Sequence, residues 1–318
     1  MTNLDIDERE SVWALKYRPT SVENMVLDKD QRAFFENMIS SKKPMSMVLS
    51  GSPGVGKTTV SRAIVKELDG ELLFLNGSGK DRGIDTVKTK IDTFAKTISL
   101  EASHKFVIYD ESDSLTQDAQ LALRSTIEDV SKNCTFILTA NMPNRLINPI
   151  LSRCHHIDLS VENSKDVMTQ MVKMCIRILK NENVEFDQKA IVKIVKSNFP
   201  DFRKTINSLQ EHGMSGRIDM EAASKIQKNS NEEFYKILKS KKFKDMHIWV
   251  LENIKDYNSF MMNFWSEAPK IFTPSTLPYA AVYLDEAQEK IDRVANPNLT
   301  MVSTFAKIMS ECEFNDSI

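Results

Sequence analysis

The fold of this chain is decided by the stretch Gly51-Ser52-Pro53-Gly54-Val55-Gly56-Lys57-Thr58. Two glycines separated by four residues, and followed by Lys and Thr, form the pattern of a phosphate-binding loop. The apolar run 45–49 before the loop predicts a buried strand, and the run 58–68 after it predicts a helix. A loop between a strand and a helix start directs unpaired backbone N–H groups and the helix dipole at an anion. The stretch therefore predicts a nucleotide site in an α/β domain.

Each part of the loop has an expected task. Lys57 should reach the outer phosphates, and the hydroxyl of Thr58 should ligate Mg²⁺. Glycine lets the backbone approach a ligand closely. A glycine-rich turn with a chance Lys-Thr pair is the alternative, and the flanking strand and helix argue against it. The residues expected to bind the nucleotide are Gly51, Ser52, Pro53, Gly54, Val55, Gly56, Lys57, Thr58 and Thr59.

Length and composition limit the class of protein. The 318 residues allow two or three domains, and 41% hydrophobic with 27% charged residues is typical of a soluble globular chain. No apolar run is long enough to span a bilayer, and the polar N-terminus does not read as a signal peptide. The four cysteines are far apart, which favours neither a zinc site nor a disulfide framework, so a cytoplasmic location is expected. With 42 basic against 44 acidic residues, binding of nucleic acid would need a local basic patch.

Short apolar runs alternate with helical patterns through the first half of the chain, which predicts a parallel sheet covered on both faces. Strands are expected at 45–49, 72–75, 106–109, 135–139 and 155–159. Helices are expected at 29–40, 58–68, 85–99 and 116–130.

No strand is expected after residue 160. Ser164, Asp187 and Asp219 are the expected N-caps of successive helices. The chain is therefore expected to divide into a nucleotide-binding domain at 1–159, a small helical domain at 160–230 and a second helical domain at 231–318. Ordinary packing is the favoured role of the large apolar residues in this last part, and contact between subunits is the alternative for some of them. The candidates for its core are Phe234, Leu238, Trp249, Phe260, Phe264 and Trp265.

Polar residues end two of the expected strands. Asp110 is placed to hold Mg²⁺, directly or through water, and Glu111 could polarise the attacking water as a general base. Asn141 follows the next strand and could orient that water or the terminal phosphate, because ligands bind outside the carboxyl ends of parallel strands. The alternatives are two acidic residues that cap a strand end and an asparagine that forms a turn.

The sequence allows two roles for each of two arginines, Arg153 and Arg203. Arg153, in Ser152-Arg153-Cys154, could stabilise transition-state charge on the nucleotide of a neighbouring subunit, or it could form a surface salt bridge. Arg203 begins a helix of the second domain, where it could reach back to the nucleotide or remain solvated. The residues alone leave both alternatives open.

These motifs together resemble the clamp-loader clade of AAA+ ATPases. Their order and spacing are similar to those of replication factor C small subunits, and Asn76-Gly77-Ser78 and 199–205 look closer still to the large subunit of T4-like bacteriophage clamp loaders. The match covers 13–212, and the last third matches only as an all-helical collar. Two departures are a Ser at position 112 of the Asp-Glu-Ser-Asp box and the absence of the zinc module of bacterial loaders. The motifs are Tyr17-Arg18-Pro19, the phosphate-binding loop, Asn76-Gly77-Ser78, Asp81-Arg82-Gly83-Ile84-Asp85, Asp110-Glu111, 116–124, Thr139-Ala140-Asn141 and Ser152-Arg153-Cys154.

The resemblance implies a fold and a set of roles. It implies an AAA+ ATPase domain, a helical lid and a helical collar, with ATP and Mg²⁺ as cofactors. The implied roles are adenine contacts for Tyr17 and Arg18, phosphate and metal binding for Lys57, Thr58 and Asp110, catalysis for Glu111, sensing for Asn141 and Arg203, and a finger for Arg153 that acts in trans.

The resemblance also implies partners. They are a ring-shaped sliding clamp, primer–template DNA, like subunits and one different, smaller subunit, and the subunits would form a five-membered ring. No membrane is expected to be involved. If the chain is a phage protein, its expected location is the host cytoplasm. The DNA backbone would be contacted by Lys80, Arg82, Lys88 and Lys90, which otherwise form a solvated helix face. Arg82, or Lys80, could pair with Glu111 until DNA competes for it. The alternatives are a cellular replication factor C small subunit, a helicase-type AAA+ motor and a non-hydrolysing ring member.

Overall fold

A computed structural model describes most of the chain. The described residues are 6–97, 104–161, 164–214, 216–220, 231–254, 257–291 and 293–315. The chain divides into two compact units, 1–223 and 224–318, and each is considered by itself.

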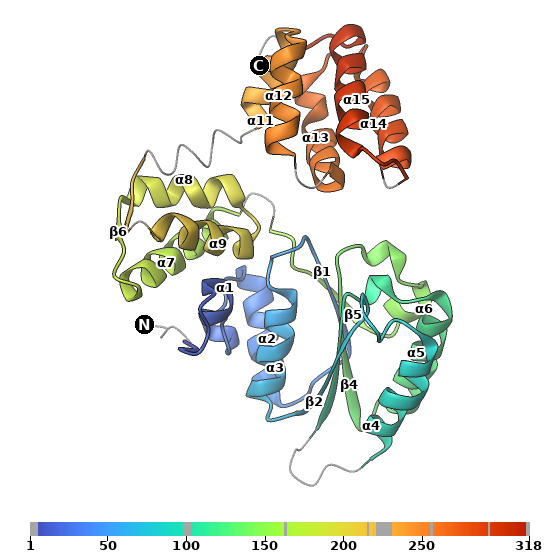
Figure 1. The fold of residues 1–318 in the computed structure, drawn as a ribbon. Helices are drawn as coiled ribbons and strands as arrows, with labels where there is room; N and C mark the ends of the chain where they lie inside the picture. The colour runs from blue at the N-terminus through green and yellow to red at the C-terminus, as the bar shows by residue number, and fades with distance from the viewer. Residues whose placement is uncertain are drawn as a thin grey trace. The chain divides into compact units, whose positions relative to one another are not determined.

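The first unit is built on a sheet of five parallel strands (Figure 1), and the predicted fold class is confirmed. The strands follow in the order β2-β3-β4-β1-β5 across the sheet. Each strand lies within about two residues of its expected range. The strands are β1 (Met47–Ser50), β2 (Glu71–Asn76), β3 (Lys105–Asp110), β4 (Cys134–Ala140) and β5 (His155–Asp158).

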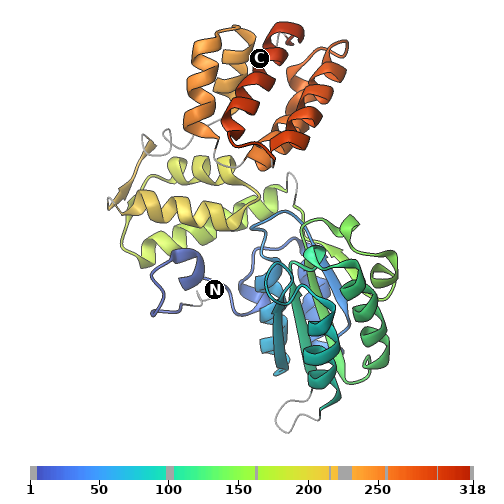
Figure 2. The same ribbon diagram turned by 45° about the vertical axis from the view of Figure 1, so that its right-hand side comes forward.

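Helices cover both faces of the sheet, because successive side chains of a strand point to opposite faces. Met47 and Leu49 of β1 pack with α2 and α3, whereas Val48 belongs to the core on the α5 side. Figures 1 and 2 show these two helical layers. The elements are α2 (Lys29–Ser41), α3 (Lys57–Glu67), α4 (Asp92–Lys96), α5 (Gln117–Asp129) and α6 (Asn148–Leu151), with a π-helical turn η2 (Thr86–Ile91) and the 3₁₀ turns η1 (Val22–Asn24), η3 (Ser112–Ser114) and η4 (Pro143–Arg145).

Three helices follow the sheet, and they begin where polar side chains cap them. Ser164 caps α7 (Lys165–Asn181) and Asp187 caps α8 (Gln188–Asn198), as predicted. Asp201 caps α9 (Phe202–Gly213); the sequence analysis expected a helix to begin at Arg203 but did not name this cap. The helix expected after Asp219 falls largely on 221–230, outside the described residues.

The prediction that no strand follows residue 160 is wrong. A short parallel pair joins β6 (Glu185–Phe186), between α7 and α8, to β7 (Arg217–Ile218), after α9. Two residues per strand are too few to give an alternating pattern in the sequence. A further short helix, α1 (Trp13–Lys16), packs against α9.

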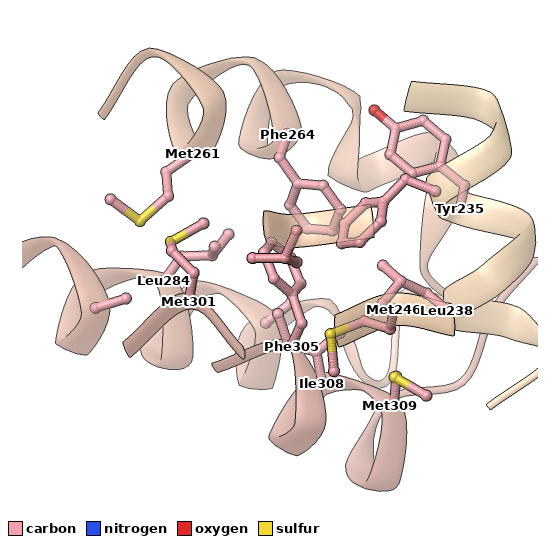
Figure 3. Close-up of a cluster of buried hydrophobic side chains, with 14 of the residues drawn as sticks. Tyr235, Leu238, Met246, Met261, Phe264, Leu284, Met301, Phe305, Ile308 and Met309 are labelled. Atoms are coloured by element: carbon pink, nitrogen blue, oxygen red, sulfur yellow. The ribbon is translucent and has the colours of Figure 1, made fainter. Parts of the chain in front are cut away.

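The second unit is all helical, as predicted. Its core gathers aromatic rings, with the centroids of Phe264 and Phe305 5.1 Å apart, and Figure 3 shows both rings among methionine and leucine side chains. The placement of Trp265 in this core is wrong, because one residue along a helix turns about 100° and leaves the Trp265 side chain 43% exposed beside the buried Phe264. The helices are α11 (Asn231–Lys239), α12 (Phe243–Asn253), α13 (Tyr257–Ile271), α14 (Leu277–Ile291) and α15 (Pro297–Glu311). None of the helices in the described ranges has the length and apolarity that a membrane crossing requires.

Candidate functional site

One pocket in the first unit brings most of the predicted nucleotide-binding residues together, whereas Gly51, Ser52 and Val55 are not among the residues that line it. Since β3, β4 and β1 are adjacent and parallel, the residues that follow them meet at one edge of the sheet. Helix α9 and the N-terminal segment form the opposite wall. The pocket is lined, among others, by Tyr17, Arg18, Pro53, Gly54, Gly56, Lys57, Thr58, Thr59, Asp110, Glu111, Thr139, Asn141, Phe202 and Arg203.

The phosphate-binding loop contacts helix α9 at Gly54. This glycine has φ 81°, in the left-handed region, and a Cβ atom built on it would lie 1.9 Å from Oδ1 of Asp201. The backbone N–H of Phe202 donates to the Gly54 carbonyl at 3.1 Å. Gly54 is therefore required both by the shape of the loop and by the close approach of helix α9.

Lys57 is held inside the loop by three oxygen acceptors. Its ammonium donates to the carbonyl oxygens of Gly51 at 2.7 Å and Ser52 at 2.9 Å, and to Oδ1 of Asn141 at 2.7 Å. Burial lowers the pKa of Lys57 to about 8, against the opposing effect of nearby carboxylates such as Asp110. A bound polyphosphate would favour the charged form and raise that pKa again.

Oxygen atoms suited to a magnesium ion lie beside the loop. The hydroxyl groups of Thr58 and Thr139 both donate to Oδ1 of Asp110, at 2.7 and 2.6 Å. Carboxylate and hydroxyl oxygens are hard ligands of the kind that Mg²⁺ prefers, and Mg²⁺ commonly completes its shell with water and substrate phosphate. Thr58 and Asp110 thus fit the metal role predicted for them.

The backbone of Glu111 is fixed in an unusual conformation. Its φ is 55°, and its N–H donates to the hydroxyl of Thr139 at 3.0 Å. Gly77 lies against it, since a Cβ on Gly77 would be 2.4 Å from the Glu111 carbonyl oxygen. A non-glycine residue in this region persists where its surroundings hold it, as they do here.

Gly77→Ala is expected to destabilise the protein by about 1–3 kcal/mol, because the added methyl group overlaps the Glu111 backbone, which hydrogen bonds to Thr139 and Ser114 hold in place. Chemical denaturation of the full-length chain measures the free energy of unfolding. Gly79→Ala is the matched control, since its Cβ would meet only the Asn76 carbonyl at 3.8 Å. Equal stability of the two variants would show that Gly77 does not fix Glu111.

Asn141 is positioned by a residue that the sequence analysis did not single out. Oδ2 of Asp113 accepts from the backbone N–H groups of Asn141 at 3.2 Å and Met142 at 3.0 Å. The available signal was its place two residues after Glu111 in the acidic box. Thr139 was quoted in a motif but given no role, although it is one of only two hydroxyl residues in β4.

The wall opposite the sheet is positively charged. Arg18 and Arg203 both line the pocket. Burial lowers the pKa of Arg18, and the positive charges of Arg62 and Arg203 lower it further. Concentrated guanidinium charge suits a polyphosphate ligand.

Arg153 does not reach this pocket. It forms an ion pair with Glu128 of α5 and donates to the Pro149 carbonyl at 2.8 Å. The surface salt bridge left open as an alternative is therefore present. Its side chain is 29% exposed, so it also remains accessible on the surface of the single chain.

The four basic residues predicted to contact DNA are all exposed. Lys90 forms an ion pair with Asp81 at 2.7 Å, and Lys80 and Arg82 lie in the loop after β2. In the part of the chain that the structure describes, Glu111 forms no ion pair with Arg82 or Lys80. The proposed competition for Glu111 thus has no counterpart in this conformation.

Two family models match consecutive parts of the chain and together cover more than half of it. Residues 47–161 match the ATPase family associated with various cellular activities, AAA. Residues 163–223 match the model described as "Sliding-clamp-loader large subunit, AAA+ ATPase lid domain".

Individual proteins are similar over most of the chain. The sliding-clamp-loader large subunit of Enterobacteria phage T4 is 30% identical over 98% of this chain and 99% of that protein. The corresponding subunit of Escherichia phage RB69 is 34% identical over 83% and 84%. The replication factor C small subunit of Sulfurisphaera tokodaii is 37% identical over 69% and 67%. Among solved structures, the Thermotoga maritima RuvB branch migration motor has a TM-score of 0.55 and 20% identity over 70% of this chain and 78% of that chain, which shows a shared fold.

Proposed function

The chain belongs to the family of sliding-clamp-loader large subunits and is an AAA+ ATPase, and on that premise we propose that it opens a ring-shaped sliding clamp and places it on primer–template DNA. ATP with Mg²⁺ would drive assembly of the open state, and hydrolysis would release the clamp. The observation that carries the proposal is the pocket in which the phosphate-binding loop, the acidic strand end and the lid helix meet.

Within that pocket the proposed roles follow the geometry. Lys57 would exchange its carbonyl acceptors for phosphate oxygens, and Thr58 with Asp110 would hold the magnesium ion, which neutralises phosphate charge. Glu111 would polarise the attacking water, and Asn141 would orient that water or the terminal phosphate.

The remaining contacts would come from the lid and the N-terminal segment. Tyr17 and Arg18 would flank the adenine, because both line the pocket beside the lid. Arg203, at the start of α9, would contact the phosphates and report their presence to the lid. A ligand that touches both walls would bias the position of the lid.

Arg153 would act on the nucleotide of the neighbouring subunit. Its exposure and its distance from its own pocket suit a residue that works in trans. The ion pair with Glu128 would then be exchanged for phosphate when subunits assemble. An exposed pair of this kind contributes little to stability and opposes such an exchange only weakly.

The proposed assembly is a five-subunit ring that joins like subunits with one different, smaller subunit, in the cytoplasm of the host cell. We assign the ATPase domain to 1–159, the lid to 160–230 and a collar that joins subunits to 231–318. The phage T4 relative matches 98% of the chain, against 69% for the replication factor C small subunit, which favours the phage assignment.

The DNA contacts can be tested by the salt dependence of binding. The double variant Lys80→Ala with Arg82→Ala is expected to lower the slope of log K against log salt by about two for primer–template DNA, because each lost phosphate contact lowers it by about one. Lys42→Ala with Lys43→Ala removes two exposed lysines from another part of the unit and is the matched control. Equal slopes for the two double variants would place the DNA elsewhere.

A further inference from the structure

The segment 11–18, called the N-terminal strap below, supplies one wall of the nucleotide pocket. Ala14, Tyr17 and Arg18 line the pocket, and Tyr17 is only 2% exposed. The strap precedes the sheet in sequence, and 28 residues separate its last residue from the start of β1. Something other than chain connectivity must therefore hold it against the pocket.

The first attachment of the strap is Glu182, at the C-terminal end of α7. Oε1 of Glu182 accepts from the Lys16 ammonium at 2.6 Å, and the hydroxyl of Tyr17 donates to the same oxygen. Asn181 donates to the Tyr17 hydroxyl at 2.7 Å. The hydroxyl of Tyr17 is thereby committed to the lid, while its ring lines the pocket.

A second attachment lies one turn along the strap. The side-chain amide of Gln210 accepts from the N–H of Trp13 at 2.9 Å and donates to the Ser11 carbonyl at 2.7 Å. The Trp13 ring lies against Gly213, where a Cβ would approach it to 3.0 Å. Gln210 and Gly213 both belong to α9, the helix that begins with Phe202 and Arg203.

Glu182 remains charged in this setting. Burial opposes its charge, but the hydrogen bonds from Lys16 and Tyr17 outweigh that effect, so its pKa lies below the usual value. The hydrogen bond to Glu182 correspondingly raises the pKa of Lys16. Charge-assisted hydrogen bonds are stronger than neutral ones, so this attachment is the firmer of the two.

We propose that Glu182 is a positioning residue for the nucleotide base: it fastens the strap to the lid, so that the base-binding wall and the phosphate-contacting Arg203 belong to one moving body. The inference rests on the proposed ATPase site. If Glu182 joins the strap to the lid, binding of the base contributes free energy to closure of the lid. Glu182 acts in this way although it is not among the residues that line the pocket.

The test compares three ligands on the full-length protein. Glu182→Ala is expected to raise the Kd of ATP and of ADP by about tenfold or more, because two hydrogen bonds to a charged group are lost. The Kd of inorganic tripolyphosphate, which has no base, should remain within about twofold. Calorimetric titration measures all three, and in steady state KM for ATP should rise while kcat is unchanged.

Two further variants separate the hydrogen bonds from the fold. Tyr17→Phe keeps the ring in the pocket and removes its hydrogen bonds with Glu182 and Asn181, both at the end of α7, so it should weaken the binding of ATP and ADP but not of tripolyphosphate. Glu182→Gln keeps an acceptor and should fall between wild type and Glu182→Ala. Glu211→Ala, an exposed change on α9 outside the pocket lining, is the control and should bind all three ligands as wild type does.

Two outcomes would overturn the inference. One is an unchanged Kd for ATP in Glu182→Ala, and the other is an equal loss of tripolyphosphate binding, which would indicate a general disturbance of the lid. Wild-type protein that binds no nucleotide would overturn the proposed function as well. Wild-type hydrolysis with an unaffected Glu182→Ala variant would overturn this inference alone.

Discussion

Glu111→Gln is expected to retain ATP and Mg²⁺ binding and to lower the rate of hydrolysis by about two to four orders of magnitude. The phosphate-binding loop and the metal-binding Asp110 remain in this variant, whereas the group that polarises water is lost. The amide matches the carboxylate in shape, and the backbone contacts of Glu111 with Thr139 and Gly77 do not involve the side chain. Single-turnover hydrolysis and nucleotide titration together separate chemistry from binding.

The variant should also stall the loading cycle after the clamp has opened. Clamp and ATP are expected to remain bound while release fails. Glu211→Gln, on the exposed face of α9, is the control for the loss of one carboxylate and should turn over normally. Hydrolysis by Glu111→Gln within a few-fold of wild type would exclude Glu111 as the base.

Arg153→Ala is expected to lower hydrolysis by about three orders of magnitude and to leave nucleotide affinity nearly unchanged, as the loss of an arginine finger does. The residue lies outside its own pocket, and the proposed effect is on the nucleotide of a neighbour. Glu128→Ala gives a control that the structure supplies. If Arg153 served only its ion pair with Glu128, both variants would have the same small effect, because exposed pairs are worth at most about 1 kcal/mol.

Mixed assemblies test the direction of this effect. Subunits carrying Lys57→Ala have an impaired phosphate-binding loop but an intact Arg153, and Arg153→Ala subunits have the reverse. Rings that contain both kinds should hydrolyse ATP only where an intact loop faces an intact arginine. Mixed rings that form but recover no activity would contradict a role in trans.

The sequence predicted the central strands β1, β3 and β4 because they are buried on both faces and therefore read as apolar runs. Met47, Val48 and Leu49 contact opposite helical layers, yet all three are apolar, so the strand was visible without knowledge of its neighbours. The phosphate-binding loop was equally clear, since its glycines are required by the backbone itself. Local patterns thus determined the elements that carry the chemistry.

What the sequence did not reveal depends on contacts between distant segments. Glu182 is separated from Tyr17 by 165 positions, and no local pattern marks it as a partner of the strap. Asp113 and Thr139 act through hydrogen bonds to other residues of the site, and their places in the acidic box and in β4 did not reveal those partners. Trp265 was misplaced because an aromatic residue next to a buried phenylalanine is assigned to the core by composition, whereas its position around the helix decides its exposure.

Loading of a clamp onto DNA tests the central claim most directly. The protein, with the smaller subunit proposed above, is incubated with fluorescently labelled clamp, Mg²⁺ and singly primed circular DNA, and the clamp that remains on the DNA is measured after gel filtration. The account predicts that ATP leaves clamp on the circle, and that omission of ATP or the Lys57→Ala change abolishes this. A non-hydrolysable analogue should leave clamp and loader bound together. Hydrolysis that neither requires nor responds to clamp and primed DNA, with no clamp retained on the circle, would contradict it.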